Sequence, residues 1–334
     1  SRSLENPQKM ESGEGAGALV KSSAAKKEKS ALKFMPPEEG FLGLSGENAF
    51  TPQQAKAWVI PFGLEESVSY GGGTGAGPEA ILNASHQVEL FDELFWKEAF
   101  RDYGVATVAP VSIAKKIPRA LEQLDAMVEE ALAAGKFPLT LGGEHSLTPG
   151  AIRPFLRRGM KLTLLHFDAH ADLRDGYGGE KYSHAAALRR CLDYENVRLV
   201  SVGIRNISAC EIPFLEANRN RIDIFWGKDR GKWTAADVAK AVGGGPVYIT
   251  FDLDGFDGSV MPATGTPEPG GIFWPDVMDI FEAVSALPDV NFVGADVVEL
   301  APAPNLHSCD FLAARLCYRI LSYAMGLRPH VVAA

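Results

Sequence analysis

Eight short apolar runs alternate with longer amphipathic segments from residue 55 onward, and Gly, Pro, Asn or Asp bounds each run. This alternation is typical of βα units, in which a helix follows each strand. Because the runs are continuously apolar, they predict a parallel sheet covered by helices on both faces. The predicted strands are residues 55–60, 104–108, 137–141, 162–167, 197–203, 222–226, 246–251 and 291–297.

The segments between these runs carry a helical pattern. In residues 118–135, Leu121, Leu124 and Val128 recur at spacings of three and four residues, which places them on one face of a helix. Further helices are predicted for residues 274–287 and 310–325.

The 334-residue chain begins with a segment of different composition. Residues 1–50 are rich in Gly, Ala, Ser, Lys and Glu, and residues 11–30 offer almost nothing to bury. Such a composition does not support a packed core. We therefore predict a flexible N-terminal arm over residues 1–50 and a single domain over residues 51–334. The sequence leaves open whether part of the arm is a targeting segment.

The composition argues against several classes of function. A formal net charge of -9 disfavours a nucleic-acid-binding surface and favours a cationic ligand or a metal-rich pocket. The four cysteines form no CxxC pair, so neither a zinc ribbon nor a thioredoxin-like site is indicated. No apolar run approaches the roughly 18 to 20 residues that a membrane span needs. These observations predict a soluble, cytoplasmic protein with no nucleic-acid or membrane partner.

Chemically distinctive side chains follow four of the predicted strands. The motifs are GGEH at 142–145, DAHAD at 168–172, DLD at 252–254 and VVEL at 297–300. In parallel sheets, ligands bind beyond the carboxyl ends of the strands, so we expect these motifs to meet there. Six side chains are candidate metal ligands: His145, Asp168, His170, Asp172, Asp252 and Asp254.

The residue types at these positions favour a divalent metal. Carboxylates crowded at one sheet edge repel each other unless cations neutralise them. Asp and His ligands without Cys favour Mn²⁺, with Zn²⁺, Ni²⁺, Co²⁺ and Fe²⁺ as alternatives. Taken singly, GGEH could be a helix-entry turn and DLD an Asx-capped turn. Their combination at successive strand ends favours the metal site.

Three longer stretches around these motifs resemble the signature motifs of the ureohydrolase family, which contains the arginases and agmatinases. They are LGGEHSLT, HFDAHADLRDGY and ITFDLDGFDGSVMPATGTPEPGG, and the resemblance covers roughly residues 55–326. Residues 70–85 and 174–190 look most like the bacterial and archaeal agmatinase branch. The resemblance implies a three-layer α/β/α domain on an eight-stranded parallel sheet, and a homo-oligomer, either a trimer or a hexamer.

The resemblance also implies two manganese ions held by six side chains. Each metal has two ligands of its own, and the metals share two bridging carboxylates. The ligands are His145 and Asp172 for one metal, His170 and Asp254 for the other, and Asp168 and Asp252 as the bridges.

Three catalytic roles follow from the same resemblance. Asp172 would hydrogen-bond the attacking hydroxide and pass its proton to the departing amine, and His184 resembles the family's mobile proton shuttle. Glu299 would pair with the guanidinium group of the substrate. His184 and Glu299 thus count as substrate-binding residues as well as catalytic ones.

Some positions depart from the family's pattern. Many members read His-Gly-Thr where this chain has Ala185 and Ala186 after His184, so the hydrogen bond from that threonine is missing. Arginases have an Ile-Asn pair after DAHAD, and the asparagine of this pair binds the carboxylate of arginine. Leu173 and Arg174 occupy that place here, which weakens the arginine hypothesis.

The leading hypothesis is an agmatinase, which converts agmatine and water into putrescine and urea. Another guanidino compound, such as guanidinobutyrate, guanidinopropionate, arginine or guanidine, is the nearest alternative. A catalytically inactive regulatory homologue is a more remote one. Arg174 affects the choice: we expect it to face solvent or to pair with Asp175 or Glu180, which favours agmatine. An Arg174 that faces the pocket would bind the carboxylate of a guanidino acid. Tyr70, Tyr177 and Trp274 are further candidates for the substrate's far end.

Overall fold

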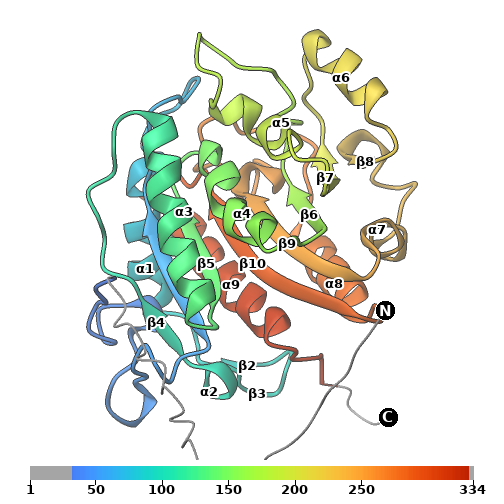
Figure 1. Ribbon diagram of the computed structural model, residues 1–334. Helices are drawn as coiled ribbons and strands as arrows, with labels where there is room; N and C mark the ends of the chain where they lie inside the picture. Colours follow the sequence, from blue (N-terminus) through green and yellow to red (C-terminus); the bar gives the residue numbers. More distant parts are fainter. Residues whose placement is uncertain (1–31, 331–334) are drawn as a thin grey trace, which may run out of the picture. The chain divides into compact units, whose positions relative to one another are not determined.

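All eight predicted strands form one parallel sheet in the computed structural model, which describes residues 32–330 (Figure 1). The strand order is β4-β1-β5-β10-β9-β6-β7-β8. The strands are β1 (Ala57–Phe62), β4 (Val105–Thr107), β5 (Phe137–Gly142), β6 (Leu162–Phe167), β7 (Val197–Ile204), β8 (Ile222–Trp226), β9 (Gly245–Asp252) and β10 (Val290–Val298). The predicted fold class is therefore confirmed.

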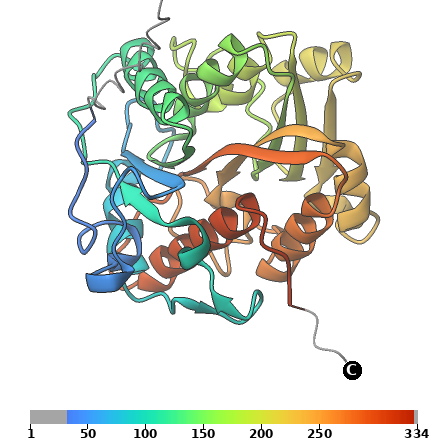
Figure 2. The same cartoon turned by 60° about the horizontal axis from the view of Figure 1, so that its bottom comes forward.

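Helices cover both faces of this sheet, as Figure 2 shows. The α-helices are α1 (Gly77–Ser85), α2 (Phe100–Tyr103), α3 (Ile117–Ala133), α4 (Thr148–Arg157), α5 (Ala187–Cys191), α6 (Ile212–Ala217), α7 (Ala235–Val242), α8 (Trp274–Ser285) and α9 (His307–Ala324). Three of them, α3, α8 and α9, correspond to the helices predicted from periodicity.

The two faces of each central strand pack against different helices. On β6, Leu164 packs with residues of α3, α4 and α5, whereas Leu165 packs with residues of α8 and α9. Successive side chains of a strand point to opposite faces, and every residue of β6 is buried. This arrangement explains why the strands are continuously apolar in sequence.

Part of the segment predicted to be flexible is folded. Phe41, Leu42 and Leu44 are buried, and Phe34 forms an antiparallel bridge to Val108. The prediction of an arm extending to residue 50 is therefore wrong for residues 32–50, because their few large apolar side chains pack on the domain. Residues 1–31 lie outside the described residues.

A short hairpin adds to the predicted elements. Its strands, β2 (Phe91–Asp92) and β3 (Lys97–Glu98), pair in antiparallel fashion and are too short to produce a periodic signal. None of the described helices combines the length and the apolarity that a membrane span requires.

Candidate metal centre

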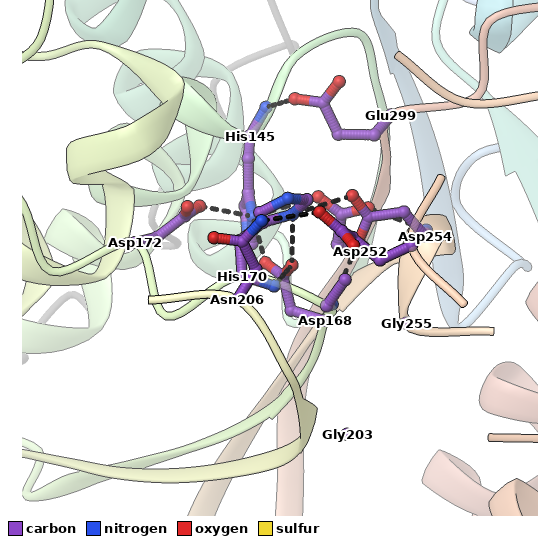
Figure 3. A network of polar contacts seen from close by, with 12 residues as sticks. His145, Asp168, His170, Asp172, Gly203, Asn206, Asp252, Asp254, Gly255 and Glu299 are labelled. Atoms are coloured by element: carbon purple, nitrogen blue, oxygen red, sulfur yellow. Dashed lines mark hydrogen bonds and ion pairs between the residues drawn. The ribbon is translucent and has the colours of Figure 1, made fainter. Parts of the chain in front are cut away.

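The four motif-bearing strands are neighbours in the middle of the sheet, in the order β5-β10-β9-β6. Their carboxyl ends meet at one edge, and the side chains that follow them converge there (Figure 3). The six predicted ligands and Glu299 lie in this cluster, although they come from four segments of the chain. They are His145 after β5, Asp168, His170 and Asp172 after β6, Asp252 and Asp254 at the end of β9, and Glu299 after β10.

His145 faces three carboxylates of the cluster. It opens the 3-10 turn η4 (His145–Leu147) and is 1% exposed. Its Nδ1 atom lies 3.2 Å from Asp168 Oδ2, 3.1 Å from Asp172 Oδ2 and 3.5 Å from Asp252 Oδ2. Nδ1 nevertheless forms no hydrogen bond of proper geometry. A buried ring nitrogen without a hydrogen bond, surrounded by carboxylate oxygens, fits a metal ligand.

His170 forms a second group with the next two carboxylates. Its Nδ1 atom lies 2.9 Å from Asp254 Oδ2 and 3.4 Å from Asp168 Oδ1. Asp168 thus turns one oxygen toward each histidine. The buried His166 lies behind it and forms a 2.8 Å hydrogen bond with its Oδ2. The two histidine groups therefore share one carboxylate.

The carboxyl groups of the cluster have shifted pKa values. Burial, and then the negative charge of Asp168, raise the pKa of Asp172 to about 7. Burial also raises the pKa of Asp252 and of Asp254, and neighbouring carboxylates add to the effect. For Asp168, burial would raise the pKa, but the close contacts with His145, His166 and His170 overcome this effect and lower it. Such a cluster requires positive charge to ionise fully, so its chemistry fits divalent cations.

Two residues of the cluster have an unusual backbone conformation. Asp172 has φ 53° and Glu299 has φ 68°, values that cost roughly 1–3 kcal/mol in residues other than glycine. The surrounding structure holds both: Asp172 O accepts the Arg189 N–H at 3.0 Å, and Glu299 N–H donates to Gly143 O at 2.8 Å. Strain of this kind gathers at functional sites.

Glu299 is buried beside His145. Its Oε1 atom accepts the backbone N–H of His145 at 2.6 Å. Burial raises the pKa of Glu299 to about 8, although that hydrogen bond opposes the shift. A cationic partner in the pocket would favour the ionised form.

His184 also lines the pocket, in the 3-10 turn η5 (His184–Ala186). Two serines contact its ring: Ser67 Oγ lies 3.2 Å from Nδ1, and Ser69 Oγ lies 2.6 Å from Nε2. Burial lowers the pKa of His184, which favours the neutral ring near pH 7. Neither serine belongs to a recognised motif, so the sequence did not indicate them.

Glu144 holds the segment that carries these serines. This carboxylate is fully buried and accepts the backbone N–H groups of Glu66 and Ser67 at 2.8 and 2.6 Å. It also accepts the hydroxyls of Ser67 and Ser146, at 2.8 and 2.5 Å. The residue before His145 therefore ties the segment around Ser67 to the edge of the sheet where the cluster lies.

The cluster forms the floor of a cavity of about 190 Å³. Arg174 lines this cavity, with its guanidinium carbon 4.9 Å from the ring centroid of Tyr177. The expectation that Arg174 faces solvent or pairs with Asp175 or Glu180 is wrong, because Arg174 lies against Tyr177 in the cavity lining and forms no ion pair with either carboxylate. Asp175 pairs with Arg190 at 2.6 Å instead.

The three aromatic candidates for the far end of the substrate differ in position. Tyr70 and Tyr177 line the cavity, and Tyr70 is 89% exposed at its rim. Trp274 begins α8 and packs against the core, away from the cavity lining. The Trp274 prediction is therefore wrong.

Comparison with known proteins adds independent information. A model of the arginase family matches residues 55–322. An N(1)-aminopropylagmatine ureohydrolase from Synechocystis sp. is 33% identical over 292 residues, which cover 84% of this chain and 92% of that relative. A guanidinobutyrase from Pseudomonas aeruginosa is 30% identical over 274 residues, which cover 79% and 85%.

Solved structures show the same likeness. The agmatine ureohydrolase of Thermoplasma volcanium matches with a TM-score of 0.72 and 28% identity, over 82% of this chain and 91% of that one. Sequence and structure comparisons thus agree on one family for residues that include the whole cluster.

Proposed function

The chain belongs to the arginase family, and we propose that it is a binuclear manganese hydrolase that converts agmatine and water into putrescine and urea. The observation that carries this proposal is the pair of histidine and carboxylate groups that share Asp168 at the floor of the cavity. The intact set of six side chains also speaks against an inactive regulatory homologue.

The distances support the proposed division of the ligands. His145 and Asp172 would hold one ion, since Nδ1 and Oδ2 lie 3.1 Å apart. His170 and Asp254 would hold the other, with their ligand atoms 2.9 Å apart. Asp168 contacts both histidines, as a bridge requires. Asp252 contacts His145 with Oδ2, and its Oδ1 accepts the backbone N–H of Asp254. Mixed carboxylate and imidazole ligands suit Mn²⁺, although they do not exclude other first-row metals.

The bound cations would supply a hydroxide nucleophile at neutral pH. Glu299 would pair with the planar guanidinium through its carboxylate and hold the central carbon over the cluster. Asp172 would accept the proton of the nucleophile and deliver it to the departing amine. His184, whose pKa is lowered, would exchange protons between this site and solvent.

Two candidate substrates differ in the group that they carry at the end opposite the guanidinium. Agmatine ends in an ammonium group, so it needs no residue that binds a carboxylate. This agrees with the presence of Leu173 and Arg174 in place of the arginases' Ile-Asn pair. A guanidino acid such as guanidinobutyrate is the second candidate, and the position of Arg174 in the cavity favours it.

A urea-release screen of the manganese-loaded protein tests these proposals. The substrates are agmatine, N(1)-aminopropylagmatine, arginine, guanidinobutyrate, guanidinopropionate and guanidine. We expect agmatine to give the highest kcat/KM and arginine to be poor. No urea from any substrate, in a sample with full metal content, would exclude the hydrolase proposal.

Assembly and location complete the proposal. We expect a homo-oligomer, either a trimer or a hexamer, and a cytoplasmic location. Size measurement in solution and microscopy of the tagged protein test these two points.

A further inference from the structure

Asp296 is a fully buried carboxylate in β10 that the proposed reaction does not use. Three hydroxyl groups point to it, two from β9 and one from the start of α4. Tyr248 Oη donates to Oδ2 at 2.9 Å, Thr148 Oγ1 donates to Oδ2 at 3.1 Å, and Thr250 Oγ1 donates to Oδ1 at 2.7 Å. A carboxylate inside a packed sheet costs free energy unless it is well paired, so its presence calls for a function.

Thr250 connects this carboxylate to the metal-facing histidine. Its Oγ1 atom lies 2.8 Å from Nε2 of His145. A hydroxyl has one proton to donate and two lone pairs to accept. Because Thr250 gives its proton to Asp296, it can only accept from His145, and Nε2 must carry the hydrogen. The neutral ring then has its free lone pair on Nδ1, the atom that faces Asp168, Asp172 and Asp252.

We propose that Asp296 is a positioning residue that acts through Thr250 to hold His145 in the Nε2–H tautomer, with Nδ1 open to a cation. The proposal rests on the proposed metal centre, and it assigns a role to two residues outside the ligand set. Carboxylates and hydroxyls behind a metal-binding histidine orient the ring and set its tautomer in this way.

The proposal predicts an effect on one of the two metals. Among the described residues, no hydrogen bond is made by Nε2 of His170, so the second group has no comparable relay. Loss of the Thr250 hydroxyl should therefore weaken the binding of the metal ion that His145 holds. The binding of the ion at His170 should stay unchanged.

Four substitutions separate this role from a structural one. Thr250→Val removes the hydroxyl at nearly constant volume, and Thr250→Ser keeps it. Thr140→Val is a matched control, because Thr140 lies beside Asp296 in the sheet register, is fully buried and its hydroxyl forms no hydrogen bond. Asp296→Asn tests the carboxylate itself.

The measurement is calorimetric titration of chelator-stripped protein with Mn²⁺. We expect Thr250→Val and Asp296→Asn to lower the affinity of one of two sites by about 10- to 100-fold. Thr250→Ser and Thr140→Val should bind like the wild type. Unchanged affinities in Thr250→Val, or equal losses at both sites, would overturn the relay. Normal binding in Asp296→Asn alone would overturn the role of Asp296.

A measurement on the unmodified protein covers the case in which a variant fails to fold. In the Zn²⁺-loaded wild type, ¹⁵N spectra of labelled histidines should place the proton of His145 on Nε2. A proton on Nδ1 would overturn the proposal. Both measurements read metal binding and ring state rather than urea release, so they stay decisive even if the proposed substrate is wrong.

Discussion

The Oγ atom of Ser69 lies 2.6 Å from Nε2 of His184, the residue that we propose as the proton shuttle. On the other side of the ring, Ser67 Oγ lies 3.2 Å from Nδ1. Serines from one short segment thus contact both ring nitrogens, in a chain that has Ala185 and Ala186 where many family members have Gly-Thr. Both contacts come from a segment more than 100 residues away in the sequence.

Ser69→Ala should slow turnover because His184 loses the hydrogen bond that orients Nε2. We expect kcat to fall by about tenfold, a fraction of what general acid–base groups contribute, while KM and metal content stay close to the wild type. Steady-state kinetics and elemental analysis test this, with Ser308→Ala on the exposed start of α9 as the control. An unchanged kcat in Ser69→Ala would show that Ser69 does not orient His184 for proton transfer.

Asp254→Asn and Glu299→Gln should separate metal binding from substrate binding. Asp254→Asn removes a proposed ligand, so metal content and activity should fall together, from two ions per chain toward one. Glu299→Gln should keep both ions, because Gln can still accept the His145 N–H. It should nevertheless lose at least about tenfold in kcat/KM, since a charged pair with the guanidinium is gone. A wild type saturated and fully active with one ion per chain would contradict the two-metal mechanism.

The strands and the ligand cluster could be predicted because their signals are local. A continuously apolar run predicts a buried strand, and DAHAD or DLD directly after such a run predicts chemistry at its carboxyl end. Each signal is contained in about ten residues. The parallel topology then brings the strand ends together without further information.

The supporting residues could not be predicted because their partners are distant in sequence. Thr250 and Asp296 are 46 residues apart, and a lone Thr or Asp within an apolar strand carries no motif. Glu144 and Ser67 meet only after the segment around Ser67 packs on the end of β5. Arg174 lies in the cavity lining, and the carboxylate of Asp175 pairs with Arg190. The sequence does not show which of the neighbouring arginines pairs with Asp175.

The metal-stripped protein should lose stability as pH rises from 5 to 9. Folding raises the pKa of Asp172 from 3.8 to about 7 and that of Glu299 from 4.5 to about 8. Folding also raises the pKa of His170 to about 12. A group with a raised pKa contributes stability that is complete below its unfolded value and is lost as pH approaches the folded value. Asp168 has a lowered pKa, so its contribution is already complete above about pH 4.

Bound Mn²⁺ should remove most of this pH dependence of stability. The cations neutralise the carboxylates that would otherwise need protons to stay uncharged in the folded protein. Thermal unfolding in EDTA and in excess Mn²⁺ tests the point. Between pH 5 and 9 we expect Tm to fall by about 5 °C or more in EDTA and to change much less with Mn²⁺. Parallel curves in the two conditions would mean that the carboxylate cluster does not bind the metal.

Arg174 provides the sharpest test of substrate choice. Its guanidinium lines the cavity beside Tyr177, and it forms no ion pair with any described residue. A positive charge in this place repels the ammonium of agmatine and attracts a carboxylate. Arginine would present a carboxylate and an ammonium together, without the asparagine that arginases use. Arg174 would attract the carboxylate of arginine and repel its ammonium, so this charge gives arginine no clear advantage.

Arg174→Ala should therefore change the two candidate substrates in opposite directions. We expect kcat/KM to stay equal or rise for agmatine, because a repulsive charge is removed, and to fall by about tenfold or more for guanidinobutyrate, because its carboxylate loses a partner. Arg174→Lys keeps the charge and serves as the control. The agmatine proposal requires agmatine to be the better substrate in the wild type in spite of this charge. If guanidinobutyrate is better there and Arg174→Ala selectively abolishes its turnover, agmatine is the wrong substrate. The metal cluster and its hydrolytic chemistry would then act on a guanidino acid.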